Sequence, residues 1–348
     1  MTSVSSVRSA RARAAALRTA LGLLAGLVLV FVFLRLVNVG AVYHRLTHLE
    51  IGFGLLCGVA FLGAYVVRAM RWRWLLRPCE VTVGRVIAIY QVATFLNWLL
   101  PIRGGEIAKA LLLRRTDGVP VSRSLATVSM DKVMDLLPAG LLLAVLPFVH
   151  LRLSRPLWAL LLFALGIVVV AAATVALAAW RRERALRLLT RPLVAVLPPR
   201  AAARVAPFIA HFLDALLSTI RRPRVILVAA AYTAAAVSLD ALFCALAFRA
   251  VGVTISLPVV LYGYTLYNLV FILPTPPGQV GSNELIGLLI FAGLFGVTHS
   301  GVGAMFLFSH PWTAVLMTCS GLVSLSVMGL TLRSTWRMAQ DQAEWVDT

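Results

Sequence analysis

Residues 97–106 read Asn-Trp-Leu-Leu-Pro-Ile-Arg-Gly-Gly-Glu and interrupt a long apolar run that resumes after them. A second interruption, at residues 268–284, reads Asn-Leu-Val-Phe-Ile-Leu-Pro-Thr-Pro-Pro-Gly-Gln-Val-Gly-Ser-Asn-Glu. A bilayer tolerates broken backbone and carboxylates only where they face protein or water. Because paired breaks in the two halves of a chain point to the binding site of a transporter, these interruptions predict a transport site.

The composition is that of a polytopic helical membrane protein. Of the 348 residues, 61% are hydrophobic and 13% are charged, whereas soluble domains hold about 25% charged residues. Basic cytoplasmic loops explain most of the net charge of +19, so we expect no nucleic-acid partner. The four cysteines lack the spacing of a metal site and are interpreted as packing residues, so no metal or cofactor is expected.

The apolar runs predict an all-α protein with six full spans and two re-entrant helical hairpins. A span needs about 20 residues; the candidate spans are 19–37, 52–69, 124–148, 157–180, 225–249 and 303–331, and the hairpins are 83–113 and 257–298. This arrangement places most basic residues on one side, which predicts cytoplasmic termini and a multi-pass location in the plasma membrane. The hairpins then enter from opposite faces, as in an inverted repeat. The alternative is that each break is a proline kink in an ordinary span.

One transmembrane domain, residues 19–331, is predicted between a basic N-terminus (1–18) and a tail (332–348), both cytoplasmic. The insert 181–224 is basic and partly amphipathic, which is typical of cytoplasmic helices that lie against anionic headgroups. A compact basic and aromatic cluster, Arg71, Trp72, Arg73 and Trp74, ends an apolar run. We interpret this cluster as an interfacial lipid contact.

Five carboxylates occupy membrane-depth sequence: Glu106, Asp131, Asp135, Asp240 and Glu284. Each one costs about 3 kcal/mol at the centre of a lipid-facing helix, so they are expected to face a polar interior. Glu106 and Lys109 are three residues apart and share a helix face if the segment is helical. Asp131 and Asp135, four residues apart, also share a face, with Lys132 beside them. The spacing predicts a polar cavity.

Helix N-termini next to cations predict anion binding in that cavity. Gly104 and Gly105 open a helix beside Arg103, and free N–H groups at such a terminus attract anions. The stretch around Gly278 and Gly281 offers a similar arrangement from the other side. Phosphate is the anion that a membrane supplies, and Arg holds it bidentately. The open alternative is that these charges pair only with one another as structural ion pairs.

The candidate substrate-binding residues are therefore Asn97, Arg103, Gly104, Gly105, Glu106, Lys109, Asp131, Lys132, Asp135, Asn268, Gly278, Gly281 and Glu284. Asp240 stands apart from them and is interpreted as an interhelical partner rather than a proton relay. His310 precedes Pro311 and is interpreted as part of a helix kink, so no His is expected near either break.

The sequence resembles the lysylphosphatidylglycerol synthetase transmembrane region, a flippase-like family of integral membrane proteins. The resemblance runs over roughly 15–335, and L-P-x-R-x-G-E at 100–106 is its most specific element. The matching residues are Arg73, Trp74, Pro101, Arg103, Gly105, Glu106, Asp131, Lys132, Asp135, Pro274, Gly278, Gly281 and Glu284. Gln279 departs from the family, which more often has a second glycine there.

The resemblance implies a non-enzymatic translocator that moves lipids between leaflets, as a stand-alone member without the aminoacyl-transferase domain fused to its best-known relatives. The implied cargo is an anionic or aminoacylated phospholipid or a polyprenyl-phosphate lipid. Two alternatives stay open: a non-transporting partner of a lipid or glycolipid synthase, and a membrane lipid-phosphate transferase. The sequence does not predict an oligomeric state.

Overall fold

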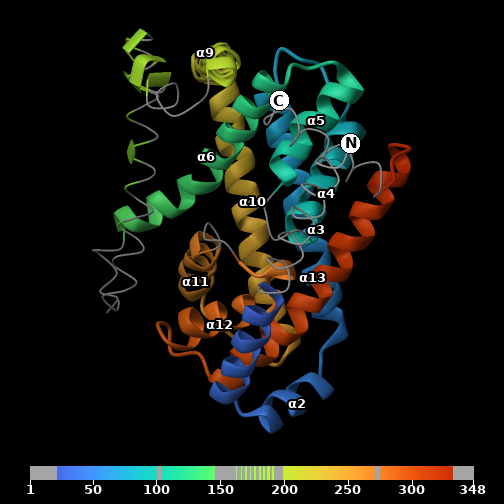
Figure 1. The fold of residues 1–348 in the computed structure, drawn as a ribbon. Coiled ribbons are helices and arrows are strands. Elements are labelled where there is room, and N and C mark those ends of the chain that lie inside the picture. Colours follow the sequence, from blue (N-terminus) through green and yellow to red (C-terminus); the bar gives the residue numbers. More distant parts are fainter. Residues whose placement is uncertain are drawn as a thin grey trace, which may run out of the picture. The chain divides into compact units, whose positions relative to one another are not determined.

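The computed structural model describes residues 22–99, 104–145, 199–270 and 275–331, together with scattered positions between 162 and 191. These residues form helices and, among themselves, no strand, which confirms the all-α prediction (Figure 1). The helices are Gly22–Leu36, α2 (Val39–Thr47), α3 (Ile51–Leu75), α4 (Val83–Leu99), α5 (Gly105–Asp117), α6 (Val121–Val145), α9 (Pro199–Ile220), α10 (Pro223–Ala250), α11 (Leu257–Val270), η2 (Pro277–Gln279), α12 (Ser282–Gly287), the π-helical turn η3 (Leu288–Ala292) and α13 (His299–Val327).

Three helices in the described part of the chain, α3, α10 and α13, are long and apolar enough to cross a membrane. A fourth candidate is the pair formed by helix Gly22–Leu36 and α2, which is bent by 92°. α6 has the length of a span, with 25 residues, but it carries the charges of residues 131, 132 and 135. Most of the predicted span 157–180 lies outside the described residues, so the count of six remains a prediction.

The first interruption produces a helical hairpin of α4 and α5. Arg85, near the start of α4, pairs with Asp117, the last residue of α5, with 2.8 Å between Nη1 and Oδ1. Further along the pair, the Lys109 ammonium lies 3.7 Å from the ring centre of Tyr90. A single kinked helix would separate Arg85 and Asp117 by about 45 Å. The start of α4 and the end of α5 therefore lie side by side, as the hairpin prediction requires.

The second interruption also folds back. Tyr267 on α11 donates a hydrogen bond to the side chain of Asn283 on α12. About one helical turn earlier on α11, Gly263 faces the ring of Phe291, because a Cβ at Gly263 would lie 2.5 Å from Cε1 of that ring. α11 and the α12–η3 segment are thus antiparallel neighbours. Each arm is shorter than the roughly 20 residues that a membrane span needs.

Pro and left-handed backbone account for the break between α11 and α12. Pro276 and Pro277 carry no N–H donor to continue a helix, and Gly278 and Gly281 have φ of 64° and 75°. Gln279 also adopts a positive φ, 58°, and no other non-glycine residue of the described chain does so. Gln279 therefore takes a left-handed conformation that glycine adopts freely and that costs a residue with a side chain about 1–2 kcal/mol.

Internal contacts divide the chain into two compact units. The first unit comprises Met1–Ala60, Leu96–Arg103 and Ala241–Leu316, and the second comprises Phe61–Phe95, Gly104–Asp240 and Met317–Thr348. In the first unit, helix Gly22–Leu36 packs against the second interruption at Gly281. In the same unit, the indole of Trp98, beside the first interruption, lies next to Gly278. The end of α4 and the turn of the second hairpin therefore meet within the first unit.

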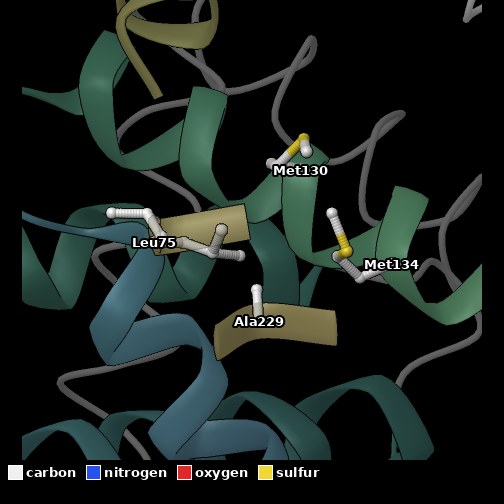
Figure 2. Packing of buried hydrophobic residues seen from close by; sticks show 5 residues of the cluster. Leu75, Met130, Met134 and Ala229 are labelled. Carbon is white, nitrogen blue, oxygen red and sulfur yellow. The ribbon is translucent and has the colours of Figure 1, made fainter. Parts of the chain in front are cut away.

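The second unit contains a buried apolar cluster that joins α3, α6 and α10. Figure 2 shows its members Leu75, Met130, Met134 and Ala229 packed together. In lipid, such helices are held by close van der Waals packing rather than by exclusion of water. The cluster fixes the three helices that also carry most of the buried charges described below.

Gly281→Ala is expected to destabilise the first unit strongly. A Cβ at Gly281 would lie 2.5 Å from the carbonyl oxygen of Gly26 and 2.8 Å from the amide nitrogen of Val30. We expect a loss of about 1–2 kcal/mol from the left-handed backbone and about 1–3 kcal/mol more from overpacking. Thermal unfolding in detergent measures this loss. Gly118→Ala is the control, since Gly118 has φ of 67° and open space around it; equal losses in both variants would contradict the close packing.

Candidate functional site

Eight charged side chains come together in the second unit. They are supplied by α3, α5, α6 and α10: Arg68, Arg71, Glu106, Lys109, Asp131, Lys132, Asp135 and Asp240. We call this set the ion network. Its four cations balance its four carboxylates, so the network is formally neutral, which lowers the cost of holding it at membrane depth.

Arg71 is the centre of the network and is fully buried. Its Nε lies 2.7 Å from Oδ1 of Asp131, and its Nη2 lies 2.6 Å from Oδ1 of Asp135. The same guanidinium donates to the backbone oxygen of Asp131 at 3.1 Å and to Oγ1 of Thr233 at 3.0 Å. The fork of donors on one Arg thus holds α6 and α10 against α3.

Lys109 extends the network into the first hairpin and is 2% exposed. Its ammonium lies 3.1 Å from Oε2 of Glu106 and 3.7 Å from Oδ2 of Asp131. Tyr90 of α4 lies under the ammonium and donates its hydroxyl to Oδ2 of Asp131 at 3.2 Å. Cation–π contact and ion pairing therefore both compensate the buried charge of Lys109.

The network opens to its surroundings at Lys132. This side chain is 50% exposed, compared with 0% for Arg71 and 2% for Lys109. Its ammonium lies 2.9 Å from Oε1 of Glu106 and 4.0 Å from Oδ2 of Asp135. Glu106 and Asp135 are themselves partly exposed. The accessible end of the network therefore presents one cation and two carboxylates.

Arg68 and Asp240 close the other end of the network. The guanidinium of Arg68 donates to both carboxylate oxygens of Asp240, and its Nε lies 3.7 Å from Oδ1 of Asp135. Because Arg68 lies on α3 and Asp240 on α10, the pair joins two helices. The interpretation of Asp240 as an interhelical partner is confirmed.

The local helix geometry explains how the network forms. Asp131 and Asp135 project from one face of α6 because they are one helical turn apart. Arg68 and Arg71 are likewise i,i+3 on α3. α5 starts at Gly105 directly after the break and ends at Asp117, and Gly118 caps it in the left-handed conformation. The short helix therefore presents Glu106 in its first turn, where the positive end of the helix dipole favours a carboxylate.

The prediction of interfacial lipid contact is wrong for Arg71 and Trp72. Both are fully buried; Arg71 belongs to the ion network, and the indole of Trp72 donates to Oγ1 of Thr127 at 3.2 Å. Arg73 and Trp74 are half-buried, so lipid contact remains a prediction for these two. A count of charges would have given the missed signal, because the five carboxylates need more cations than Arg103, Lys109 and Lys132 supply. Arg68 and Arg71 lie inside an apolar run and are the cations that this count lacked.

The remaining predicted site residues lie elsewhere. The structure joins Glu106, Lys109, Asp131, Lys132 and Asp135, and Gly104 and Gly105 begin the helix that carries two of them. Arg103 lies outside the described residues. Asn97 is half-buried near the end of α4, and exposed Asn268 donates to the backbone oxygen of Tyr264 at 2.9 Å. Gly278, Gly281 and Glu284 belong to the first unit.

Sequence reasoning missed a second buried pair, in the first unit. Glu284, in the first turn of α12, contacts His310 of α13, with 2.5 Å between Oε1 and Nδ1. The other ring nitrogen of His310 lies 2.8 Å from the backbone oxygen of Gly278. His310 thus lies at the second break, contrary to the expectation that no His is near. No short-range spacing signals this pair, since 26 residues separate its members.

A search of the described residues for three or more His, Cys, Asp or Glu side chains that could hold a metal ion finds none. The described residues bring together two sets of charged side chains, the ion network in the second unit and a buried carboxyl–imidazole pair in the first.

Comparison with known proteins agrees with a membrane protein of apolar helices. The family model of the lysylphosphatidylglycerol synthase TM region matches residues 19–321. A UPF0104 membrane protein of Methanothermobacter thermautotrophicus is 26% identical over 256 residues, which cover 69% of this chain and 71% of that protein. No solved structure matches the chain.

Proposed function

We propose, from the premise that this chain belongs to the family of the lysylphosphatidylglycerol synthase TM region, that it moves a phosphate-bearing lipid between the leaflets of the plasma membrane. The cargo class is an anionic or aminoacylated phospholipid or a polyprenyl phosphate. The observation that carries the proposal is the ion network, a buried set of four cations and four carboxylates with one accessible end.

The cost of such a network supports a functional role. Buried ion pairs contribute little net stability, because desolvation of both charges offsets their attraction. Apolar residues of similar volume would hold the same helices together at least as well. Ionisable residues inside a membrane protein therefore mark a substrate or ion pathway by default.

Partner exchange at Lys132 gives the network a mechanism. The ammonium of Lys132 is held by Glu106 at 2.9 Å and is half exposed. A lipid phosphate that approaches this end takes the place of Glu106 as the partner of Lys132, and Glu106 remains paired with Lys109. When the phosphate leaves, Glu106 recovers Lys132. Each carboxylate of the network and the phosphate keep at least one cationic partner at either stage, so entry and release both avoid a large electrostatic barrier.

The accessible carboxylates extend the range of headgroups. An ammonium on the headgroup, as in an aminoacylated lipid, can pair with Asp135 or Glu106 while the phosphate pairs with Lys132. Both hairpins are broken helices, and the first one carries Glu106 and Lys109 of the ion network. Hinged broken helices are the elements through which transporters alternate access. We expect both termini in the cytoplasm and expect membrane lipids as partners.

Translocation rather than chemical conversion is the activity that the network favours. Each carboxylate of the network is engaged by at least one cation, whereas a general base needs a position from which it can take a proton from substrate. The fully buried Asp131 is the clearest case, since Arg71, Lys109 and Tyr90 all contact it.

The test is leaflet translocation by the purified full chain in proteoliposomes. The probes are short-chain labelled phosphatidylglycerol, lysyl-phosphatidylglycerol and a polyprenyl phosphate, with protein-free liposomes as the control. The proposal predicts accelerated movement of at least one probe. If well-folded protein moves none of the three, the role of an accessory partner for a lipid synthase replaces it.

A further inference from the structure

The Glu284–His310 pair has no part in the ion network and needs an explanation of its own. Glu284 is 5% exposed and His310 is 8% exposed. Oε2 of Glu284 is buried and has no hydrogen-bond partner among the described residues. A carboxyl oxygen left without a partner in a buried site carries a desolvation cost that a purely structural pair would avoid.

The contacts of His310 determine where its hydrogens are. A backbone carbonyl only accepts, so Nε2 of His310 must carry the hydrogen that it donates to Gly278. Nδ1 then faces Oε1 of Glu284 at 2.5 Å, a distance that requires one hydrogen between the two atoms. The pair exists either as imidazolium with carboxylate or as neutral imidazole with carboxylic acid. In both forms it holds one shared proton and is neutral.

Loss of the shared proton makes the observed geometry untenable. A lone pair on Nδ1 would then face a carboxylate oxygen across a hydrogen-bond distance, with a net negative charge in a buried place. The contact between α12 and α13 would have to open or draw in another cation. Protonation of the pair is thus linked to the position of the second hairpin against α13. The second hairpin is a broken helix, and broken helices of this type move in transporters.

The described elements around the pair provide no strong competing charge. On α11, Tyr267 is the titratable neighbour and reaches α12 through Asn283. On α13, the flanking Ser309 and Thr313 bond to Met305 and to the backbone of His310. Helix Gly22–Leu36 meets the hairpin through Gly26, Leu29 and Val30. Among the described residues, no Arg or Lys forms an ion pair with Glu284, and His310 is the ionisable side chain that contacts it.

We propose that Glu284 and His310 form a proton-binding site whose proton is taken up and released as the protein moves lipid, so that a proton gradient drives transport. This inference rests on the proposed function for its coupling, whereas the proton-binding site can be tested alone. The proton shared by Oε1 and Nδ1 leaves to water and returns from it, and no other reactant takes part.

The first test measures proton binding without any lipid cargo. Infrared difference spectra of the purified full chain, recorded across a series of buffers of increasing pH, are expected to show a carboxylic-acid band and an imidazole band that change together. Both bands are expected to disappear in Glu284→Gln, whose amide still donates to Nδ1 and preserves the fold. They are expected to persist in Glu50→Gln and His299→Gln, which remove exposed groups of the same unit. Identical wild-type and Glu284→Gln spectra would overturn the site.

The second test measures coupling in proteoliposomes with labelled phosphatidylglycerol and with the membrane potential clamped. One proton per lipid predicts about a tenfold steady-state asymmetry of the probe for each pH unit across the membrane. Glu284→Gln is expected to abolish the asymmetry, and Glu50→Gln is expected to retain it.

The outcomes separate the two proposals. Wild-type translocation that ignores the pH gradient, or follows a sodium gradient instead, overturns the coupling and leaves the proposed function standing. If the wild type moves no lipid, the proposed function and the coupling both fall, and the infrared result alone decides the proton site.

Discussion

Arg71→Met is expected to lower the free energy of unfolding by about 3–5 kcal/mol, because it leaves buried carboxylates without their main cation. Asp131 is 0% exposed and would keep only the longer contact to Lys109, at 3.7 Å, and the hydroxyl of Tyr90. Asp135 would lose its 2.6 Å contact. Denaturation of the purified protein in mixed detergent micelles, followed by circular dichroism, measures the loss.

Two comparison variants make this result specific to the buried charge. Arg85→Met removes an Arg that is 42% exposed and pairs with Asp117, and exposed pairs contribute about 0–1 kcal/mol. Adding Asp131→Asn to Arg71→Met removes the orphaned charge, so the double variant is expected to be more stable than the single one. A loss under 1 kcal/mol in Arg71→Met would show that the ion network does not hold the second unit together.

Lys132→Gln is expected to slow lipid translocation by about 10- to 100-fold, the equivalent of one charged hydrogen bond. Lys132 is the most exposed cation of the ion network, and its removal takes away the group that exchanges Glu106 for phosphate. The fold is expected to persist, because Glu106 keeps Lys109 as a partner and exposed pairs contribute little. The initial rate of probe movement in proteoliposomes measures the effect.

The matched control for this variant is Arg85→Gln, which removes one positive charge from the same unit at the open end of the first hairpin. Its translocation rate is expected to stay close to that of the wild type. Equal slowing in both variants would attribute the effect to net charge, and an unchanged rate in Lys132→Gln would remove Lys132 from the path of the headgroup.

Local spacing made part of the site predictable from sequence. Asp131, Lys132 and Asp135 lie within little more than one turn of α6, and Glu106 and Lys109 are one turn apart on α5, so their shared faces follow from helix geometry. Both hairpins were signalled by Pro and Gly clustered within a few residues of apolar sequence, since such clusters break helices, whereas the single prolines Pro138 and Pro311 lie inside α6 and α13. The contacts within each hairpin bear out the predicted folding back.

Contacts between distant segments were not predictable in this way. Arg71 was assigned to the membrane interface because Arg and Trp commonly gather there, and only the packing of α3 against α6 shows that it is buried. His310 was interpreted as part of a kink because its partner lies 26 residues earlier. That meeting depends on the turn at Gly278 and Gly281, which carries Glu284 back to α13. Burial and pairing across helices are tertiary properties that one-dimensional spacing does not contain.

The most direct measurement of the central claim is the distance between lysine nitrogen and lipid phosphorus. The chain has two lysines, Lys109 and Lys132, so ¹⁵N-lysine labelling gives two side-chain signals in solid-state NMR. ¹⁵N–³¹P recoupling in bilayers of the transported lipid is expected to show one lysine within direct contact of phosphate, and that signal is expected to vanish in Lys132→Gln. Absence of phosphorus contact to either lysine, or contact to Lys109 alone, would contradict entry of the headgroup at the accessible end of the ion network.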